Sequence, residues 1–333
     1  MSTASSPLNL PSEVWQVLDR SITVEYTSLT RACAPVMVPV TPYVSDDRTT
    51  LDVATGLTYP TKAERARRNP KVSLLYSDPL GSGLVQPPVV LVQGLATVRD
   101  TDLQANTDRY ARLVMAKTPA AFKGQPRFLL RTLDWYFARI WVHVTPLRVW
   151  WWDSETMTSE PGQWVAPPET VAPPSDPAPP GKQPGAWLEP PSDWRTTARD
   201  VIPRLDQRSL AWVDADGFPL SVPATGLDQT ETGFRLQIGG HLPGTPAGPA
   251  CLTVHSHPEV FTGQENQTFL GEVQVGSGEA YDFVVERALA DFSITGNKVV
   301  RSLGFLRKGR SLKPRLAAEA ARRGQPVPSV RLP

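Results

Sequence analysis

The feature that most constrains the fold is a proline-rich stretch near the middle of the chain. Eleven prolines lie between Pro161 and Pro191. Because each proline lacks a backbone N–H group and restricts the residue before it, no helix or interior strand persists at this density. We interpret residues 157–194 as a semi-rigid linker, with a docking site for proline-reading modules as the alternative.

The linker divides the chain into two candidate domains. Residues 20–153 form the first domain and residues 195–300 the second, and a basic tail follows at 301–333. A chain of 333 residues is long enough for two domains of ordinary size. Apolar residues make up 40% of the sequence, which is enough for a packed core in each domain.

Composition also limits which binding partners and which cellular location we expect for the protein. The net charge is +1, whereas nucleic-acid-binding proteins usually carry a basic excess. The sequence has no apolar run of membrane-spanning length and no secretory signal. Cys33 and Cys251 lie far apart and give neither a disulfide framework nor metal-ligand spacing. These features predict a cytoplasmic protein that acts on a small molecule, with no nucleic-acid partner, no membrane partner and no metal site.

Both halves contain runs of β-branched residues with approximate alternation, which predict strands. Short helices are expected at 61–69, 101–116, 127–137 and 193–205. Three segments recur in the same order: 50–56 matches 234–240, 72–79 matches 251–258, and 89–98 matches 266–275 with glycine on glycine. The pattern predicts a mainly β protein with one small antiparallel barrel in each half.

The segment from Thr50 to Pro79 carries the residues of a candidate binding site. It reads as a strand, a turn, a basic helix and a second strand. The hydroxyls of Thr55 and Thr61, the ammonium of Lys62 and the free N–H groups at the helix start together suit a phosphate monoester.

The basic helix offers further cations. Arg65, Arg67 or Arg68 would add a second positive charge to the site, depending on which of them faces inward. The alternative is that this helix is only a solvated basic surface.

The same segment resembles a known superfamily. A strand ending in Thr55, the Thr61-Lys62 step, a basic helix and Asn69-Pro70 before an apolar run form a pattern similar to that of the FMN-binding split β-barrel superfamily. This superfamily includes pyridoxamine 5'-phosphate oxidase-like and deazaflavin-dependent reductase-like proteins. The resemblance implies tandem antiparallel split β-barrels, the second one degenerate, fused by the linker into a pseudo-dimer. Such a chain would be a monomer or a homodimer.

The resemblance also implies a flavoprotein site. The coenzyme would be FMN, with a deazaflavin as the alternative. Its phosphate would lie on the residues of the basic motif, and its ring would lie beside the second strand. The cofactor-binding residues implied are Lys62, Thr61, Thr55, Arg65, Arg68, Val38, Val40 and Thr41. The catalytic residues stay unknown, since hydride transfer is carried by the coenzyme itself.

The second half lacks this motif. Residues 239–250 contain no lysine and no arginine, so the second site is expected to be degenerate. His255 and His257 alternate on a predicted strand, as metal ligands sometimes do, but exposed or core-edge histidines are the preferred interpretation. The tail at 301–333 is interpreted as a solvated basic helix, with a contact to an acidic cofactor tail or weak nucleic-acid binding as alternatives.

The function predicted from these features is a flavin- or deazaflavin-dependent oxidoreductase. It would transfer hydride between the bound coenzyme and a small molecule whose identity the sequence does not give. The alternatives are a non-catalytic flavin-binding protein and a two-barrel protein without a cofactor.

Overall fold

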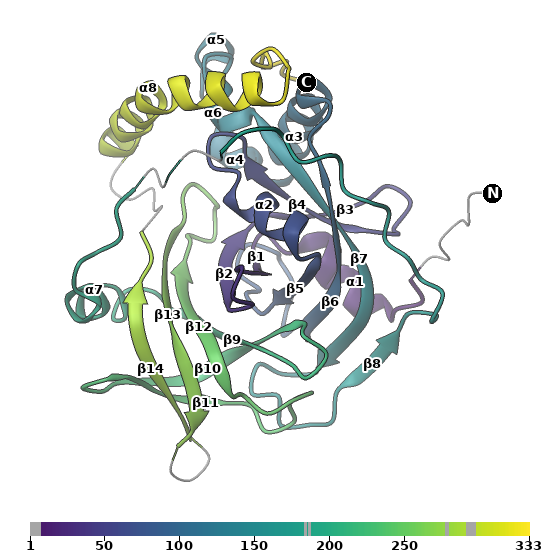
Figure 1. The fold of residues 1–333 in the computed structure, drawn as a ribbon, viewed down its shortest axis with the longest axis vertical. Coiled ribbons are helices and arrows are strands. Elements are labelled where there is room, and N and C mark those ends of the chain that lie inside the picture. The colour runs from purple at the N-terminus through teal and green to yellow at the C-terminus, as the bar shows by residue number, and fades with distance from the viewer. Residues whose placement is uncertain (1–7, 183–184, 186–187, 277–279, 291–297) are drawn as a thin grey trace.

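The computed structural model describes residues 8–182, 185, 188–276, 280–290 and 298–333. It consists of two antiparallel β units and peripheral helices (Figure 1). The strands of the first unit are β1 (Val24–Leu29), β2 (Pro35–Val40), β3 (Pro42–Val44), β4 (Leu51–Gly56), β5 (Lys71–Tyr76), β6 (Val89–Arg99), β7 (Arg139–Trp152) and β8 (Gly162–Val165). Those of the second are β9 (Gln207–Val213), β10 (Pro219–Gln229), β11 (Gly233–Ile238), β12 (Gly248–Ser256), β13 (Glu265–Val275) and β14 (Ala280–Ala288).

The helices lie mostly around the first unit. They are α1 (Ser12–Arg20), α2 (Thr61–Arg68), α3 (Leu103–Lys117), α4 (Pro119–Phe122), α5 (Arg127–Leu130), α6 (Asp134–Phe137), α7 (Trp194–Val201) and α8 (Lys298–Arg322). In Figure 1, helices α3 to α6 and α8 gather at the end of the first unit that points away from the second barrel, whereas α7 lies beside the second barrel.

The two units share one strand order. The first sheet runs β2-β1-β5-β6-β7-β4-β3, and the second runs β10-β9-β12-β13-β14-β11 and closes back onto β10. The single strand β10 pairs with both β9 and β11. In the first unit its place is taken by β2, which pairs with β1, and by β3, which pairs with β4. The predicted fold, mainly β with two antiparallel barrel units in tandem, is confirmed.

Two glycines mark corresponding positions in the units. Gly94 lies opposite Val72 and next to a β-bulge between β6 and β7. Gly271 lies opposite Ala250 and next to a β-bulge between β13 and β14. The predicted match of these two glycines therefore agrees with the strand pairing.

The other two matched segments are wrong by one residue. The strand pairing makes Val72 equivalent to Ala250, whereas the match of 72–79 with 251–258 placed it on Cys251. The match of 50–56 with 234–240 is shifted in the same way, since Leu51 corresponds to Phe234. Because side chains alternate along a strand, such a shift places core residues on the wrong face.

The units pack tightly against each other. The second core includes side chains of the first unit, namely Leu75, Val89, Leu91, Trp150 and Trp152. Strand β2, an edge strand of the first sheet, lies against β12 and β13. Proline is tolerated at such an edge, which explains Pro39 within β2. The two barrels therefore form one continuous structure, as expected for a fused pseudo-dimer.

Several local predictions need correction. The helix predicted at 127–137 consists of two short helices, α5 and α6. Strand β8 lies within the predicted linker, where it pairs with β7 as an edge strand. Helix α1 and strand β14 were not predicted. The exact domain boundaries stay a prediction.

His255 in β12 and His257 just after it are neither exposed nor at the edge of a core. His255 Nε2 lies 2.8 Å from Glu25 Oε1, and His257 Nε2 lies 3.0 Å from Asp78 Oδ2. All four side chains are buried between the two units. Each histidine thus pairs with a carboxylate of the first unit, a long-range contact that a strand pattern does not encode.

In the part of the chain that the structure describes, no helix is both long and apolar enough to cross a membrane.

Candidate functional site

The basic motif lies at the turn that connects β4 to α2. Strand β4 ends at Gly56, a turn follows, and α2 begins at Thr61 directly after Pro60. Ala63 and Ala66 are the fully buried small residues of α2 and pack on the first core. Burial of this small-residue face turns Lys62 and Arg65 toward the sides of the helix, where both are half-buried.

Gly56 permits a close approach at this point. A Cβ atom there would lie 2.9 Å from Nη1 of Arg139 and 2.9 Å from the ring of Tyr59. The end of β4 therefore has room for a guanidinium only because residue 56 has no side chain.

Three cations converge on this turn. Burial and the charges of Arg65 and Arg139 lower the pKa of Lys62 to about 8. Arg65 donates from Nε to Ser28 Oγ at 3.0 Å, and burial lowers the pKa of Arg65 to about 10, so it stays charged at neutral pH. In the described residues, no carboxylate forms an ion pair with Lys62, Arg65 or Arg139.

Arg139 was not among the site residues predicted from the sequence. It begins β7, is 7% exposed, and lies among three tyrosines. Its guanidinium lies 4.3 Å from the ring of Tyr110 and 5.0 Å from that of Tyr136, and Nη2 donates to the Tyr110 hydroxyl at 3.0 Å. Tyr59 also hydrogen-bonds to Arg139. Aromatic faces stabilise part of a buried charge, but they do not neutralise it.

The arrangement fits an anion. Buried or half-buried cations without a counter-ion are costly, and a phosphate monoester at this place would neutralise them through charge-assisted hydrogen bonds. We name the set formed by Lys62, Arg65 and Arg139 the cation cluster. Its position at the first unit's α2, with Arg65 also close to Cys251 of the second unit, places it near the junction of the units.

The other predicted phosphate ligands differ in how far they are buried. Thr55 is buried, and its hydroxyl donates to the Tyr59 carbonyl at 3.4 Å, so it shapes the turn. Thr61 and Arg68 are exposed. Lys62 and Arg65 are thus brought together, while Arg68 lies at the outer end of α2.

The residues predicted to lie beside the ring belong to the edge strand. Val38 and Val40 are half-buried and pack against the first core, and Thr41 is half-buried between β2 and β3. The carbonyl of Met37 accepts hydrogen bonds from second-unit hydroxyls, Thr253 and Thr268, both at 3.0 Å. The second unit therefore covers this edge at Met37, and the assignment of ring contacts stays a prediction.

The corresponding place in the second unit is filled by Thr156 and Met157. Gly239 is the counterpart of Gly56, and a Cβ atom there would lie 2.4 Å from the side chain of Met157. Met157 is fully buried in the second core, and its carbonyl accepts the His241 N–H at 3.1 Å. The linker residue Met157 thus lies against Gly239 as Arg139 and Tyr59 lie against Gly56, and the degeneracy of the second site stays a prediction.

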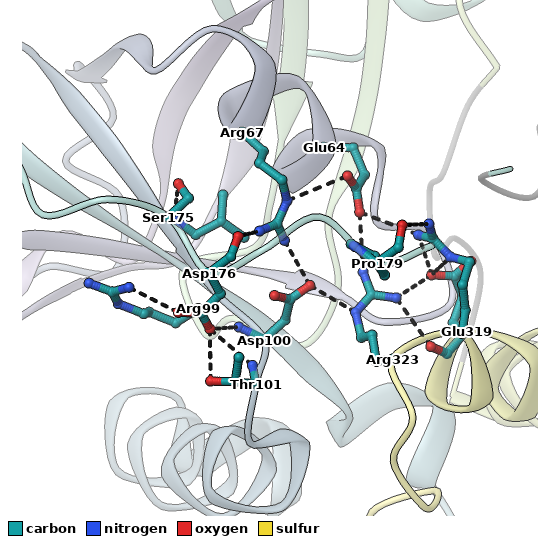
Figure 2. Close-up of polar contacts among 12 residues, drawn as sticks. Glu64, Arg67, Arg99, Asp100, Thr101, Ser175, Asp176, Pro179, Glu319 and Arg323 are labelled. Atoms are coloured by element: carbon teal, nitrogen blue, oxygen red, sulfur yellow. Dashed lines mark hydrogen bonds and ion pairs between the residues drawn. The ribbon is translucent and has the colours of Figure 1, made fainter. Parts of the chain in front are cut away.

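The opposite side of α2 carries a charged network (Figure 2). Arg67 pairs with Asp100 at 2.8 Å, and Arg323 of α8 pairs with the same carboxylate at 2.8 Å. Glu64 lies 3.3 Å from both Arg322 and Arg323. Arg67 therefore has its counter-ions inside the protein, and it is not available for a ligand.

A groove elsewhere on the surface is separate from these residues. It lies between α1 and the loop before β6, with Glu13, Gln16, Arg20 and residues 83–88 along its walls. None of the predicted site residues lines it.

No model of a known protein family and no curated protein matches this chain. Several solved structures are similar to it. An F420 reductase is 15% identical over 42% of this chain and 98% of its own, with a TM-score of 0.32. A Clostridium acetobutylicum protein related to general stress protein 26, of the pyridoxinephosphate oxidase family, is 11% identical over 46% of this chain and 92% of its own, with a TM-score of 0.32. An FAD-binding protein from Mesorhizobium loti is 18% identical over 42% of this chain and 90% of its own, with a TM-score of 0.30.

Each similarity extends over less than half of this chain. Because the TM-scores lie below 0.5, what this chain binds has to be inferred from its own residues.

Proposed function

We propose that the first unit binds the phosphate of a flavin or deazaflavin coenzyme at the cation cluster, and that the protein is an oxidoreductase. The observation that carries this proposal is the convergence of Lys62, Arg65 and Arg139 without a carboxylate partner among the described residues. A doubly charged phosphate would offset the mutual repulsion of these cations. FMN is the first candidate, and a deazaflavin coenzyme is the second.

The residues of the cation cluster and of the turn before α2 have different roles in binding the phosphate. Lys62 supplies an ammonium with three donors, and Arg65 and Arg139 supply guanidinium donors. Thr55 and Gly56 hold the turn that brings these groups together. The coenzyme, when bound, would supply hydride transfer, so the protein needs only to bind and orient it.

The direct test is a titration of the purified protein with FMN and, separately, with a deazaflavin coenzyme. Replacing Lys62 by alanine removes a charge-assisted interaction of about 1.5–3 kcal/mol, so we expect the dissociation constant to rise by roughly ten- to a hundredfold. The matched control is Lys123→Ala, which removes an exposed lysine outside the site. Equal affinities for wild type and Lys62→Ala would contradict the assignment.

A second candidate function is a coenzyme-binding protein without turnover. The covered edge at Met37 favours it, because the second unit fills part of the surface next to the predicted ring position. Reduction of the bound coenzyme by NADH or NADPH, followed by its absorbance, separates an oxidoreductase from a binding protein. A protein that binds neither coenzyme would leave the cofactor-free two-barrel alternative.

We further infer that the chain is a monomer that contains its own pseudo-dimer. Its second unit already covers the β2 edge, where a partner subunit would otherwise pack. Sedimentation equilibrium gives the molecular mass that tests this.

A further inference from the structure

The C-terminal helix α8 follows the second unit in the chain but packs on the first. Leu312, Leu316 and Ala320 are buried in the first core, together with residues of α2 and β4. Figure 1 shows α8 across the end of the first unit, beside α5 and α6. The interpretation of this region as a solvated basic helix is wrong, because one face of α8 is buried.

One side chain of α8 reaches the turn that precedes α2. Arg315 donates from Nε to the Thr58 carbonyl at 3.1 Å and from Nη2 to the Gly185 carbonyl at 2.9 Å. Thr58 is fully buried and lies between Gly56 and Pro60. A single guanidinium therefore joins the site's turn to the linker, with one donor on each.

The far side of α2 is held by the charged network of Figure 2. Glu64 accepts from Arg322 and Arg323, and Glu319 also pairs with both of these arginines. Arg67, Arg322 and Arg323 balance Glu64, Asp100 and Glu319, so this network is neutral as a whole. It fixes α2 relative to α8 without attracting an anion.

We propose that α8 positions the anion site, and that Arg315 is its positioning residue. Glu64 lies two residues from Lys62, and Thr58 lies in the turn before it, so α8 contacts the chain on both sides of the lysine. With both contacts in place, Lys62 is held half-buried near Arg65 and Arg139. This inference rests on the proposed anion site, but it concerns a different part of the molecule.

The variant Arg315→Ala tests the proposal better than a change in the network. Removing Arg322 or Arg323 would leave the buried carboxylates of the network with one positive charge too few, which generally destabilises a protein strongly. Arg315 instead donates to two neutral carbonyls. The matched control is Arg195→Ala, because Arg195 also donates to a backbone carbonyl, that of Glu231, at 3.1 and 2.8 Å in the second unit. Urea denaturation of each variant checks that it remains folded.

Two measurements follow. The first is FMN affinity, which we expect to fall about tenfold in Arg315→Ala, to recover in part in Arg315→Lys, and to stay within twofold in Arg195→Ala. The second is the pKa of Lys62 without ligand, obtained from trace acetic anhydride labelling across pH 7 to 11. Loosening the turn would hydrate Lys62, so in Arg315→Ala its pKa should rise from about 8 toward the ordinary value of about 10.4.

An unchanged Lys62 pKa in Arg315→Ala would overturn the positioning role, whether or not FMN affinity falls. If wild type binds neither FMN nor a deazaflavin coenzyme, the proposed function fails, and the labelling still decides the role of Arg315. The two proposals therefore fail separately.

Discussion

Glu25 offers the sharpest test of how the two units are joined. Its Oε1 atom accepts from His255 Nε2 at 2.8 Å, from Ser77 Oγ at 3.0 Å and from Ser209 Oγ at 3.4 Å. His255 and Ser209 belong to the second unit, and the Glu25 side chain is 0% exposed. Glu25→Ala would remove the acceptor of three donors inside the interface.

The expected cost follows from this burial. A buried donor left without its acceptor costs about 1–3 kcal/mol, because it loses its partner without regaining water, and Glu25→Ala would leave three such donors. The whole free energy of unfolding of a domain is of the order of 5–15 kcal/mol, so the loss would be a large part of it. Glu25→Gln retains a carbonyl oxygen for one donor, and we expect it to cost less than Glu25→Ala.

Urea denaturation followed by tryptophan fluorescence measures the change. Trp150, Trp152 and Trp212 are buried in the second core and report on the interface. The matched control is Glu13→Ala, an exposed glutamate of α1, for which we expect a change of no more than about 0.5 kcal/mol. A loss below about 1 kcal/mol for Glu25→Ala would refute the view that this carboxylate holds the units together.

Two further predictions concern pH and packing. Burial opposes the charge on His257, but the adjacent Asp78 outweighs burial and raises the pKa of His257. Burial likewise opposes the charge on Asp78, but hydrogen bonds from His257 and the Leu80 N–H outweigh it and lower the pKa of Asp78. A raised pKa of His257 stabilises the folded protein fully below about pH 6.5, and a lowered pKa of Asp78 does so above about pH 4. The pair therefore contributes most to the free energy of unfolding between these two pH values. Its contribution falls as the pH rises through the pKa of His257 in the folded protein. Melting temperatures from pH 5.5 to 8.5 should show this decline, and a His257→Gln variant with the same decline would contradict it. Gly94→Ala would place a Cβ atom 2.5 Å from the Thr145 carbonyl oxygen, so we expect the free energy of unfolding in urea to fall by about 1–3 kcal/mol. A change within about 0.5 kcal/mol would show that the backbone at the bulge moves to accommodate the Cβ atom.

Much of the fold could be predicted from local patterns. Alternating β-branched residues marked most strands, and a basic stretch ended by Asn69-Pro70 marked α2. Gly94 and Gly271 were matched correctly because a bulge with a close backbone contact requires glycine at both places. The neighbouring segments were shifted by one residue, because sequence similarity at this level does not fix which face of a strand is buried.

The site could be predicted only in part. Lys62 and Arg65 follow from the motif of a single segment. Arg139 lies at the start of a distant strand, and its role depends on the tyrosine cage formed by Tyr59, Tyr110 and Tyr136. An arginine at the start of a mostly apolar strand was the only local sign, and it does not by itself indicate an anion site.

The sequence by itself determined the positions of most strands along the chain, the two-unit organisation and a cationic turn without an equivalent in the second half, since these depend on neighbouring residues. The tertiary structure decided which charges are neutralised. Folding gave Arg67 its carboxylates and left Lys62, Arg65 and Arg139 without them in the described residues, and it placed Met157 where a second cation would lie. The reason is physical: the cost of a charge depends on burial and on partners within a few ångströms, and both are set by segments that lie far apart in the chain.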